Sequence, residues 1–327
     1  MAARPHCSEG GTRVGRASPP CPAACGLTRL SPRYPTPAAF RRALTDRLRA
    51  RAAASRWNLA QLQRQLAYDR LLERVYSRDD GWVLKGATAL LAREIGVRAT
   101  IDVDLYRSAE PDSAEANLRA AAQTDIGDWF VFEVGPTRPA GDAASARRLP
   151  VSARVGNTTW ASFHVDIAGP HLRMTGRPER VQALARLGMP DVEQHGYHAY
   201  PLVDHIADKL AAMYESRGAV RASSTRFRDL VDLVAITVSA TVAGRPLILA
   251  VRSEAARRGL TLPDRLVVPD RSTWEAGYAA EARRSLLSEA TTLDAALQVV
   301  GALIDPVLDG SVKGAWDPRT RTWRRSR

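Results

Sequence analysis

The fold of this chain is decided by two short blocks, Trp82-Val83-Leu84-Lys85-Gly86-Ala87-Thr88 and Thr100-Ile101-Asp102-Val103-Asp104-Leu105-Tyr106. In the first block, three apolar residues run into a turn that contains glycine, and this pattern predicts a strand followed directly by a helix. In the second block, apolar and acidic residues alternate, which is the period of a strand. Together the blocks predict a sheet with acidic side chains on one face.

The alternation in the second block predicts which side chains share a face. Ile101, Val103 and Leu105 are expected to pack inward. Asp102 and Asp104 are then expected to lie together on the opposite face. Two neighbouring carboxylates repel each other unless a cation joins them, and Mg²⁺ (or Mn²⁺) takes such oxygen ligands together with substrate phosphates. Solvated acids at a sheet surface are the ordinary alternative for such a pair.

A third carboxylate is expected from the segment Phe163-His164-Val165-Asp166-Ile167. The same alternation turns Asp166 away from the core, with the polar residues of its sheet. Carboxylates of Asp102, Asp104 and Asp166 on adjacent strands would suit two metal ions about 4 Å apart, an arrangement that serves in-line displacement at phosphorus. Taken alone, Asp166 is more simply a solvated acid.

The turn between the first strand and its helix is a candidate phosphate site. Gly86 lets the backbone approach a ligand closely, and the helix N-terminus that follows offers free N–H groups to an anion. Thr88 would add a hydroxyl. The alternative is an ordinary strand–turn–helix junction in which Thr88 caps the helix. The glycine spacings of a P-loop and of a dinucleotide-binding loop are both absent from this block.

The second half of the chain is expected to be helical almost throughout. From Pro201 onward, apolar residues recur at helical spacing in the segments 203–217, 226–239, 246–258, 274–288 and 292–308. A short polar loop joins the first two helices, so these are expected to be antiparallel and to bring Lys209 near Arg228 or Asp229. A lysine and an arginine there would suit a triphosphate. The alternative for Arg228 is a surface ion pair with Asp232, one helical turn further along.

These patterns place the chain in the α+β class, with a small mixed sheet flanked by N-terminal helices and a helical C-terminal half. The N-terminal helices are expected at 38–49 and 59–76, and further strands at 129–134, 150–155 and 160–167. As domains we expect a disordered tail at 1–34, a core with its N-terminal helices at 35–200, a helical region that completes the site at 201–318, and a basic tail at 319–327.

Positive charge is concentrated in three short stretches. The chain of 327 residues has 47 Lys and Arg against 35 Asp and Glu, a formal net charge of +12. Most of the excess lies in 1–30, in the helix segment 41–56 and in 319–327, and the remainder is close to neutral. A basic chain favours a nucleic-acid partner, and here the segments 41–56 and 319–327 are the expected contacts.

The N-terminal segment and the absence of long apolar runs bear on the compartment. Cys7, Cys21 and Cys25 are the only cysteines in the sequence. Together with His6 they could ligate zinc, but the Pro-, Gly- and Ser-rich composition favours disorder. The segment has no apolar core of a secretory signal, and no run in the chain approaches the roughly 18–20 apolar residues of a membrane span. We therefore expect a cytoplasmic protein without a membrane partner.

Taken in order, these blocks resemble the AbiEii/AbiGii toxin family of nucleotidyltransferases, within the polymerase-beta-like superfamily. The resemblance covers about residues 35–318 and rests on the stretches Trp82–Leu90, Arg98–Leu105, Ile206–Ala212 and Ser224–Leu233. Three positions depart from the family pattern. The family usually has two glycines where Gly86-Ala87 stands, often Thr where Ser224 stands, and often Lys where Arg228 stands.

The resemblance implies a metal-dependent nucleotidyltransferase that is the toxin of a bacterial toxin–antitoxin or phage-defence pair. Such an enzyme would transfer NMP from an NTP to an RNA, with the tRNA acceptor end as the expected target, and would release pyrophosphate. A cognate antitoxin protein is the implied partner. The alternatives are transfer to a small molecule or a protein hydroxyl, and a catalytically silent protein that binds nucleotide or RNA.

The resemblance also assigns roles by position. Mg²⁺ or Mn²⁺ would be held by Asp102 and Asp104, with Asp166 as the third ligand, and the first two would count as catalytic. Asp229 would position Lys209 or assist proton transfer. The nucleotide-binding residues implied are Gly86, Ala87, Thr88, Lys209 and Arg228.

Overall fold

The computed structural model describes residues 34–140, 143–169, 172–189, 192–215 and 224–325. The chain divides into two units, 1–31 and 32–327, and every described residue belongs to the second. The predicted N-terminal tail up to residue 33, with Cys7, Cys21, Cys25 and the zinc alternative, lies outside the described residues. So does most of the loop expected between Lys209 and Arg228.

Two helices precede the sheet, as the sequence predicted. The first, α1 (Pro37–Ala53), is capped by Thr36, whose side chain accepts from the Ala39 amide at 3.2 Å. Its buried residues Phe40, Leu44 and Leu48 follow the expected spacing of four. The second, α2 (Leu59–Arg78), begins with a capping box formed by Asn58 and Gln61. The two helices pack against each other and supply part of the core under the sheet.

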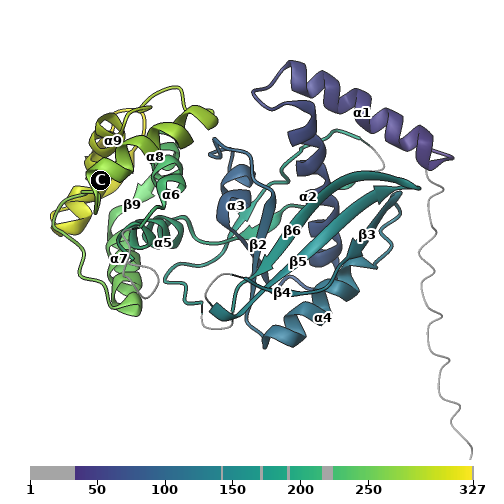
Figure 1. Ribbon diagram of the computed structural model, residues 1–327, viewed down its shortest axis with the longest axis horizontal. Coiled ribbons are helices and arrows are strands. Elements are labelled where there is room, and N and C mark those ends of the chain that lie inside the picture. The colour runs from purple at the N-terminus through teal and green to yellow at the C-terminus, as the bar shows by residue number, and fades with distance from the viewer. Residues whose placement is uncertain (1–33, 141–142, 170–171, 190–191, 216–223, 326–327) are drawn as a thin grey trace, which may run out of the picture. The chain divides into compact units, whose positions relative to one another are not determined.

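A mixed sheet of eight strands forms the first half of the chain (Figure 1). Its strands are β1 (Trp82–Lys85), β2 (Asp102–Arg107), β3 (Phe130–Val134), β4 (Arg138–Ala140), β5 (Ala143–Val155), β6 (Thr158–Ile167), β7 (Glu179–Val181) and β8 (Tyr197–Ala199). The order is β3-β5-β6-β2-β1-β8-β7, with β4 paired to β5. Only the β1–β8 and β2–β6 pairs are parallel. The sheet confirms the predicted α+β class.

Helices cover one face of this sheet and leave the other face to the candidate site. Helices α2 and α4 (Pro111–Ala122) pack on the covered face, and α3 (Gly86–Ala92) connects β1 to β2. Val103 and Leu105 of β2 are fully buried in the resulting core, as the alternation predicted. The inward position predicted for Ile101 is wrong, because this residue precedes β2 and its side chain is 52% exposed.

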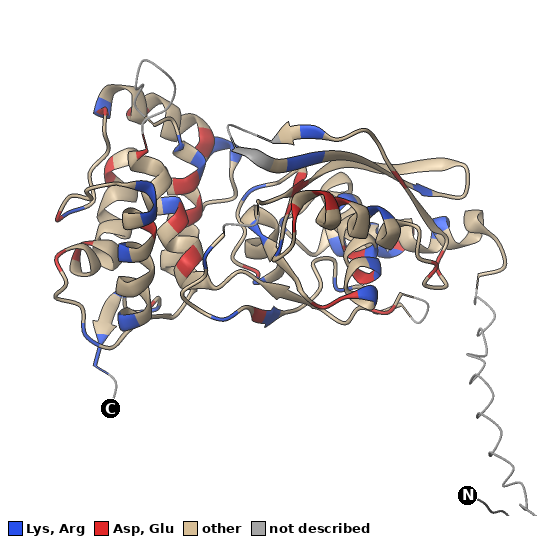
Figure 2. Cartoon of the chain, turned by 90° about the horizontal axis from the view of Figure 1, so that it is seen from below, with Lys and Arg blue, Asp and Glu red and all other residues tan. Residues whose placement is uncertain are grey.

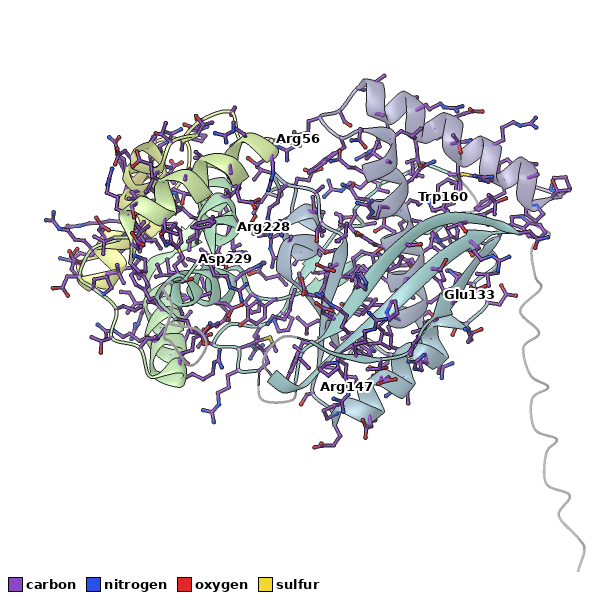
Figure 3. All side chains as sticks on the ribbon, viewed as in Figure 1. Arg56, Glu133, Arg147, Trp160, Arg228 and Asp229 are labelled. Atoms are coloured by element: carbon purple, nitrogen blue, oxygen red, sulfur yellow. The ribbon has the colours of Figure 1, made fainter. Side chains whose placement is uncertain are left out.

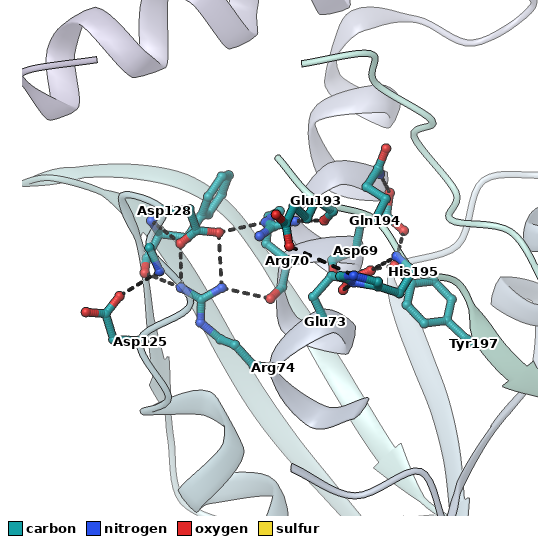
Figure 4. A network of polar contacts seen from close by, with 12 residues as sticks. Asp69, Arg70, Glu73, Arg74, Asp125, Asp128, Glu193, Gln194, His195 and Tyr197 are labelled. Atoms are coloured by element: carbon teal, nitrogen blue, oxygen red, sulfur yellow. Dashed lines mark hydrogen bonds and ion pairs between the residues drawn. The ribbon is translucent and has the colours of Figure 1, made fainter. Parts of the chain in front are cut away.

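A buried polar network joins α2 to the loop that precedes β8 (Figure 4). Asp69 accepts hydrogen bonds from the amides of Leu184 and Ala185 at 2.8 and 2.7 Å. Arg70 and Arg74 both bind Asp128, at 2.6 and 2.5 Å, and all three side chains are at most 2% exposed. Buried charges of this kind are tolerated only when they are paired and hydrogen-bonded, so the network fixes the edges of the sheet on α2.

The second half of the chain is the predicted set of helices. They are α5 (Leu202–Tyr214), α6 (Phe227–Ser239), α7 (Gly244–Arg258), α8 (Arg271–Arg284) and α9 (Leu293–Leu308). They stand beside the large sheet (Figure 1) and enclose a second apolar core. Acidic and basic residues are interspersed along the chain in both halves (Figure 2). Among the described residues, no helix combines the length and the apolar character that crossing a membrane requires.

A small antiparallel sheet closes the C-terminal half, and only its last strand lies in the predicted tail 319–327. Its strands are β9 (Val242–Ala243), β10 (Ala315–Asp317) and β11 (Thr322–Arg324). Arg324 pairs with Asp317 at 2.8 Å, and Arg321 pairs with Glu289 at 2.5 Å. The chain through Arg324 is therefore folded, and two of its arginines are already engaged by acids.

Candidate active site

Three carboxylates lie on the uncovered face of the large sheet. In the parallel β2–β6 pair, Asp104 lies opposite Asp166, and Asp102 lies opposite His164. Because alternate residues of a strand share a face, Asp102, Asp104 and Asp166 stand on the same side. The alternation in the sequence predicted that these side chains face away from the core. The strand register that makes Asp104 and Asp166 neighbours cannot be predicted from the sequence alone.

The glycine turn after β1 presses against one of these carboxylates. Gly86 has a φ of +60°, and a Cβ at this position would stand 1.8 Å from Asp104 Oδ2. Glycine is therefore required both for its left-handed conformation and for the close approach. Ala87 is already a helical residue of α3, so the departure from two glycines imposes no strain.

Thr88 does not face a ligand as the sequence predicted. Its side chain is fully buried, and Oγ1 donates to the backbone oxygen of Asp102 at 2.9 Å. Lys85 is the N-cap of α3, and no side chain caps this helix, so the alternative capping role of Thr88 is also wrong. The hydroxyl instead holds the start of β2, and with it Asp102, against α3.

Lys209 on α5 lies between two carboxylates of α6. Its Nζ is 2.9 Å from Asp229 Oδ1 and 2.7 Å from Asp232 Oδ2, and its side chain is 7% exposed. Burial alone would lower the pKa of Lys209, but the two carboxylates outweigh it and hold that pKa above its usual value. Lys209 is therefore positively charged and held in one position. Its contact with Asp229 confirms the neighbour that the sequence predicted.

Asp232 and Arg98 complete this cluster, and the site prediction did not include either. Arg98 donates to both oxygens of Asp232 at 2.9 Å. Burial favours the neutral acid, but Lys209 and Arg98 outweigh it and lower the pKa of Asp232 to about 2. Arg98 and Asp232 both lie in stretches that resemble the family, Arg98–Leu105 and Ser224–Leu233, and this position could have indicated a role in the site. Because 134 residues separate them in the chain, the sequence does not predict that they are in contact.

Arg228 is held by an acid of α8, and its predicted role in the triphosphate site stays a prediction. Its guanidinium pairs with Glu281 of α8 at 3.2 Å, and the side chain is 63% exposed. Figure 3 labels Arg228 and Asp229 on α6. Consecutive helical residues point about 100° apart, so only one of the two can face α5. The alternative surface pair with Asp232 is wrong, because Asp232 is buried on Lys209 and Arg98.

The carboxylates of the sheet and the lysine of α5 belong to one electrostatic site. Burial, together with the charges of Asp166 and Asp102, raises the pKa of Asp104 to about 6, and Lys85 and Lys209 oppose this rise. Lys85 was not predicted as a site residue, although it ends β1 directly before Gly86. Its Nζ lies 4.5 Å from the centre of the Tyr200 ring. The site thus has acids on the sheet and cations at its border with α5.

The three carboxylates are better arranged to bind one divalent cation than two. Asp102 Oδ1 is buried and has no hydrogen-bond partner, which leaves an oxygen suited to a hard cation. Asp166 is instead bound by Arg148, with contacts of 2.8 and 2.6 Å. In the described part of the chain, no group of three His, Cys, Asp or Glu side chains converges as a metal site. Asp102 and Asp104 are the fitting donors, with substrate phosphates completing the shell.

Comparison with known proteins identifies a family and proteins of similar structure. Residues 70–299 match the family described as nucleotidyl transferase AbiEii toxin, type IV toxin–antitoxin system. MenT4, a nucleotidyltransferase toxin from Mycobacterium tuberculosis, has a similar structure, with a TM-score of 0.53 and 19% identity over 82% of this chain and 89% of MenT4. JHP933 from Helicobacter pylori matches with a TM-score of 0.45 and 16% identity over 76% of this chain and 92% of its own. No curated protein matches by sequence.

Proposed function

The chain belongs to the AbiEii family of nucleotidyltransferase toxins of type IV toxin–antitoxin systems, and we propose from this premise that it transfers NMP to RNA. The tRNA acceptor end is the proposed target, and pyrophosphate is the product released. The family assignment implies an NTP substrate and an antitoxin partner.

One observation carries the proposal: a fixed cation on α5 borders the carboxylates on the sheet. Lys209 is held by Asp229 and Asp232 at 2.9 and 2.7 Å, and its charge acts on Asp104. A triphosphate between the two groups would meet Lys209 at its phosphate oxygens and the carboxylate side at its α-phosphate. Positioning and charge neutralisation supply most of the rate in phosphoryl transfer.

The carboxylates have the proposed task of holding Mg²⁺ or Mn²⁺. A bound divalent ion would neutralise phosphate charge and lower the pKa of an attacking hydroxyl. Asp102 and Asp104 would bind it, with the Gly86 turn fixing Asp104 and the Thr88 hydroxyl fixing the backbone at Asp102. Asp229 would keep Lys209 in place, since its Oδ1 is 2.9 Å from Nζ.

A basic groove beside α1 supports an RNA substrate. The groove has a volume of about 740 Å³ and lies between α1, the start of α2 and the β5–β6 turn. Its arginines are Arg41, Arg42 and Arg49, and Arg49 pairs at 3.2 Å with Asp46, an acid that also lines the groove. Arg51 and Arg56 of the same basic segment are instead bound to the backbone oxygens of Arg186 and Gly96, at 3.3 and 2.6 Å.

The groove lies at a distance from the carboxylates that an RNA duplex could span. Thr158 lines the groove and Asp166 belongs to the carboxylate cluster, and both are on β6. A strand rises about 3.3 Å per residue, so the two positions are about 25 Å apart. The proposed arrangement places RNA phosphates on the arginines and the 3′ end at the carboxylates.

Labelling of total tRNA with NTPs carrying a labelled α-phosphate tests the proposal. We expect RNA labelling that requires Mg²⁺ or Mn²⁺, that is lost in Asp102→Ala, and that is kept in the control Asp112→Ala, whose side chain is 91% exposed. Label that survives RNase treatment would favour a small-molecule or protein acceptor. NTP binding without transfer from any of the four NTPs would favour a silent nucleotide-binding protein.

A further inference from the structure

Arg148 of β5 extends the carboxylate cluster by one charged group. Its Nε is 2.8 Å from Asp166 Oδ1, and its Nη2 is 2.6 Å from Asp166 Oδ2. The same Nη2 is 3.8 Å from Asp102 Oδ1. Both oxygens of Asp166 are therefore taken by one guanidinium, in the parallel fork that makes arginine–carboxylate pairs strong.

The strand register builds this arrangement. Arg148 lies directly opposite Asp166 in the antiparallel β5–β6 pair, and Asp166 lies opposite Asp104 in the parallel β2–β6 pair. The three side chains form a row across three adjacent strands on one face, with neighbours about 5 Å apart. The position of Arg148 therefore follows from the sheet itself and does not depend on a loop.

We propose that Arg148 is a built-in cation that occupies Asp166 and limits the site to one divalent ion, bound by Asp102 and Asp104. The proposal rests on the proposed function only in taking these carboxylates as the metal ligands. It departs from the sequence expectation, in which Asp102, Asp104 and Asp166 would together hold two metal ions.

Charge supports one ion over two. In the nucleotide-free site, one guanidinium and one divalent ion balance the formal charge of the three carboxylates, whereas a second ion would add positive charge that no carboxylate of this group compensates. Arginine cannot lose its proton in a protein, so its charge cannot be removed to admit that ion. The side chain is 40% exposed, which lets water reach the guanidinium without freeing Asp166.

Mn²⁺ binding to the purified full-length chain tests this role without any nucleotide. Free Mn²⁺ is measured by electron paramagnetic resonance as Mn²⁺ is added. At equal free Mn²⁺, we expect Arg148→Ala to bind one more ion per chain than the wild type, because Asp166 becomes available. The double variant Arg148→Ala/Asp166→Asn should lose that gain. Arg148→Gln, which keeps most of the side-chain length, should behave like Arg148→Ala.

Arg147→Ala is the matched control, since it removes the same charge from the adjacent residue. Arg147 (Figure 3) contacts Asp112 at 3.2 Å, and neighbouring strand residues point to opposite faces. Its Mn²⁺ binding should equal that of the wild type. Circular dichroism spectra confirm that each variant is folded before it is titrated.

Two outcomes overturn the proposal. One is Mn²⁺ binding by folded Arg148→Ala and Arg148→Gln that does not exceed the wild type. The other is a gain that persists in the double variant, which would place the additional ion away from Asp166. Neither outcome depends on nucleotidyl transfer. If the chain transfers no NMP, Arg148→Ala can still bind one more Mn²⁺ than the wild type. If the chain does transfer NMP, Arg148→Ala can still bind no additional ion.

Discussion

Gly86 stands so close to Asp104 that a Cβ on the glycine would lie 1.8 Å from the Oδ2 of the aspartate. This contact joins the turn after β1 to the carboxylates of β2, and it explains why the turn needs glycine at one of its two positions. The left-handed φ of +60° at Gly86 adds a second reason.

Gly86→Ala should therefore lower kcat/KM by at least about 100-fold, because the new methyl group has to displace the Asp104 carboxylate. Steady-state kinetics with labelled NTP would measure the loss. Gly188→Ala is the control, since Gly188 has no left-handed φ and no atom within 4 Å of the added Cβ. A Gly86→Ala enzyme with near wild-type kinetics would show that the contact with Asp104 is irrelevant to the reaction.

Lys209 and Arg228 should differ sharply, although the sequence predicted both as nucleotide ligands. Lys209→Ala removes the buried cation beside the carboxylates, and kcat/KM for NTP should fall by about 100-fold or more. Arg228→Ala removes a 63%-exposed side chain that pairs with Glu281, and kcat/KM should stay within about twofold of the wild type. Equal losses in the two variants would contradict the orientation of α6 described here.

RNA binding should depend on the arginines that line the groove beside α1. Arg41→Gln/Arg42→Gln should weaken RNA binding and reduce the slope of log K against log salt by about 1–2, as expected when two phosphate contacts are lost. The control is Arg283→Gln/Arg284→Gln on α8, two exposed residues outside the groove. Filter binding at several salt concentrations measures both slopes, and an unchanged slope in the first variant would remove the groove from the RNA path.

Asp128 should contribute to stability at neutral pH and lose that contribution in acid. Burial favours its neutral form, but Arg74 and Arg70 outweigh this and lower the pKa of Asp128 below its usual value. A lowered folded-state pKa stabilises the fold above the unfolded pKa of about 3.9, and the benefit is lost as pH falls through the folded pKa. Asp128→Asn should therefore cost about 3–5 kcal/mol at pH 7, because it leaves two buried cations unpaired.

Urea unfolding at several pH values checks this prediction. The difference in free energy of unfolding between wild type and Asp128→Asn should shrink as the pH falls below the unfolded pKa of about 3.9, because the unfolded wild-type chain then gains a proton that the folded carboxyl resists. Asp112→Asn, which changes a side chain that is 91% exposed, should show no such dependence. A difference for Asp128→Asn that stays constant from pH 7 to pH 3 would mean that its ionisation does not stabilise the fold.

Local patterns in the sequence predicted most of the fold. The spacing of Phe40, Leu44 and Leu48 gave α1, and the alternation around Asp102 and Asp104 gave β2 and its polar face. The start of β5 was placed at 150, whereas the strand begins at Ala143, because its polar first half lacks the apolar residues that mark a strand. Very short strands such as β10 and β11 depend on pairing and leave no periodic signal.

Contacts between distant parts of the chain limited the prediction of the site. Asp229 was placed near Lys209 correctly because consecutive helices with a short connection are antiparallel. Arg98 and Asp232 could not be paired in this way, since 134 residues separate them. Arg148 was missed because only the β5–β6 register brings it to Asp166. The rotation of α6, which turns Arg228 outward, is likewise set by packing against α8 and α9.

The sheet carboxylates and Lys209 are proposed to form one centre for nucleotidyl transfer. Pyrophosphate release from each of the four NTPs, measured with Mg²⁺ and total tRNA, tests this proposal. We predict release by the wild type and by Asp112→Asn with at least one NTP, and a loss of at least about 1,000-fold in Asp104→Asn. Release by folded Asp104→Asn at the wild-type rate would contradict the account.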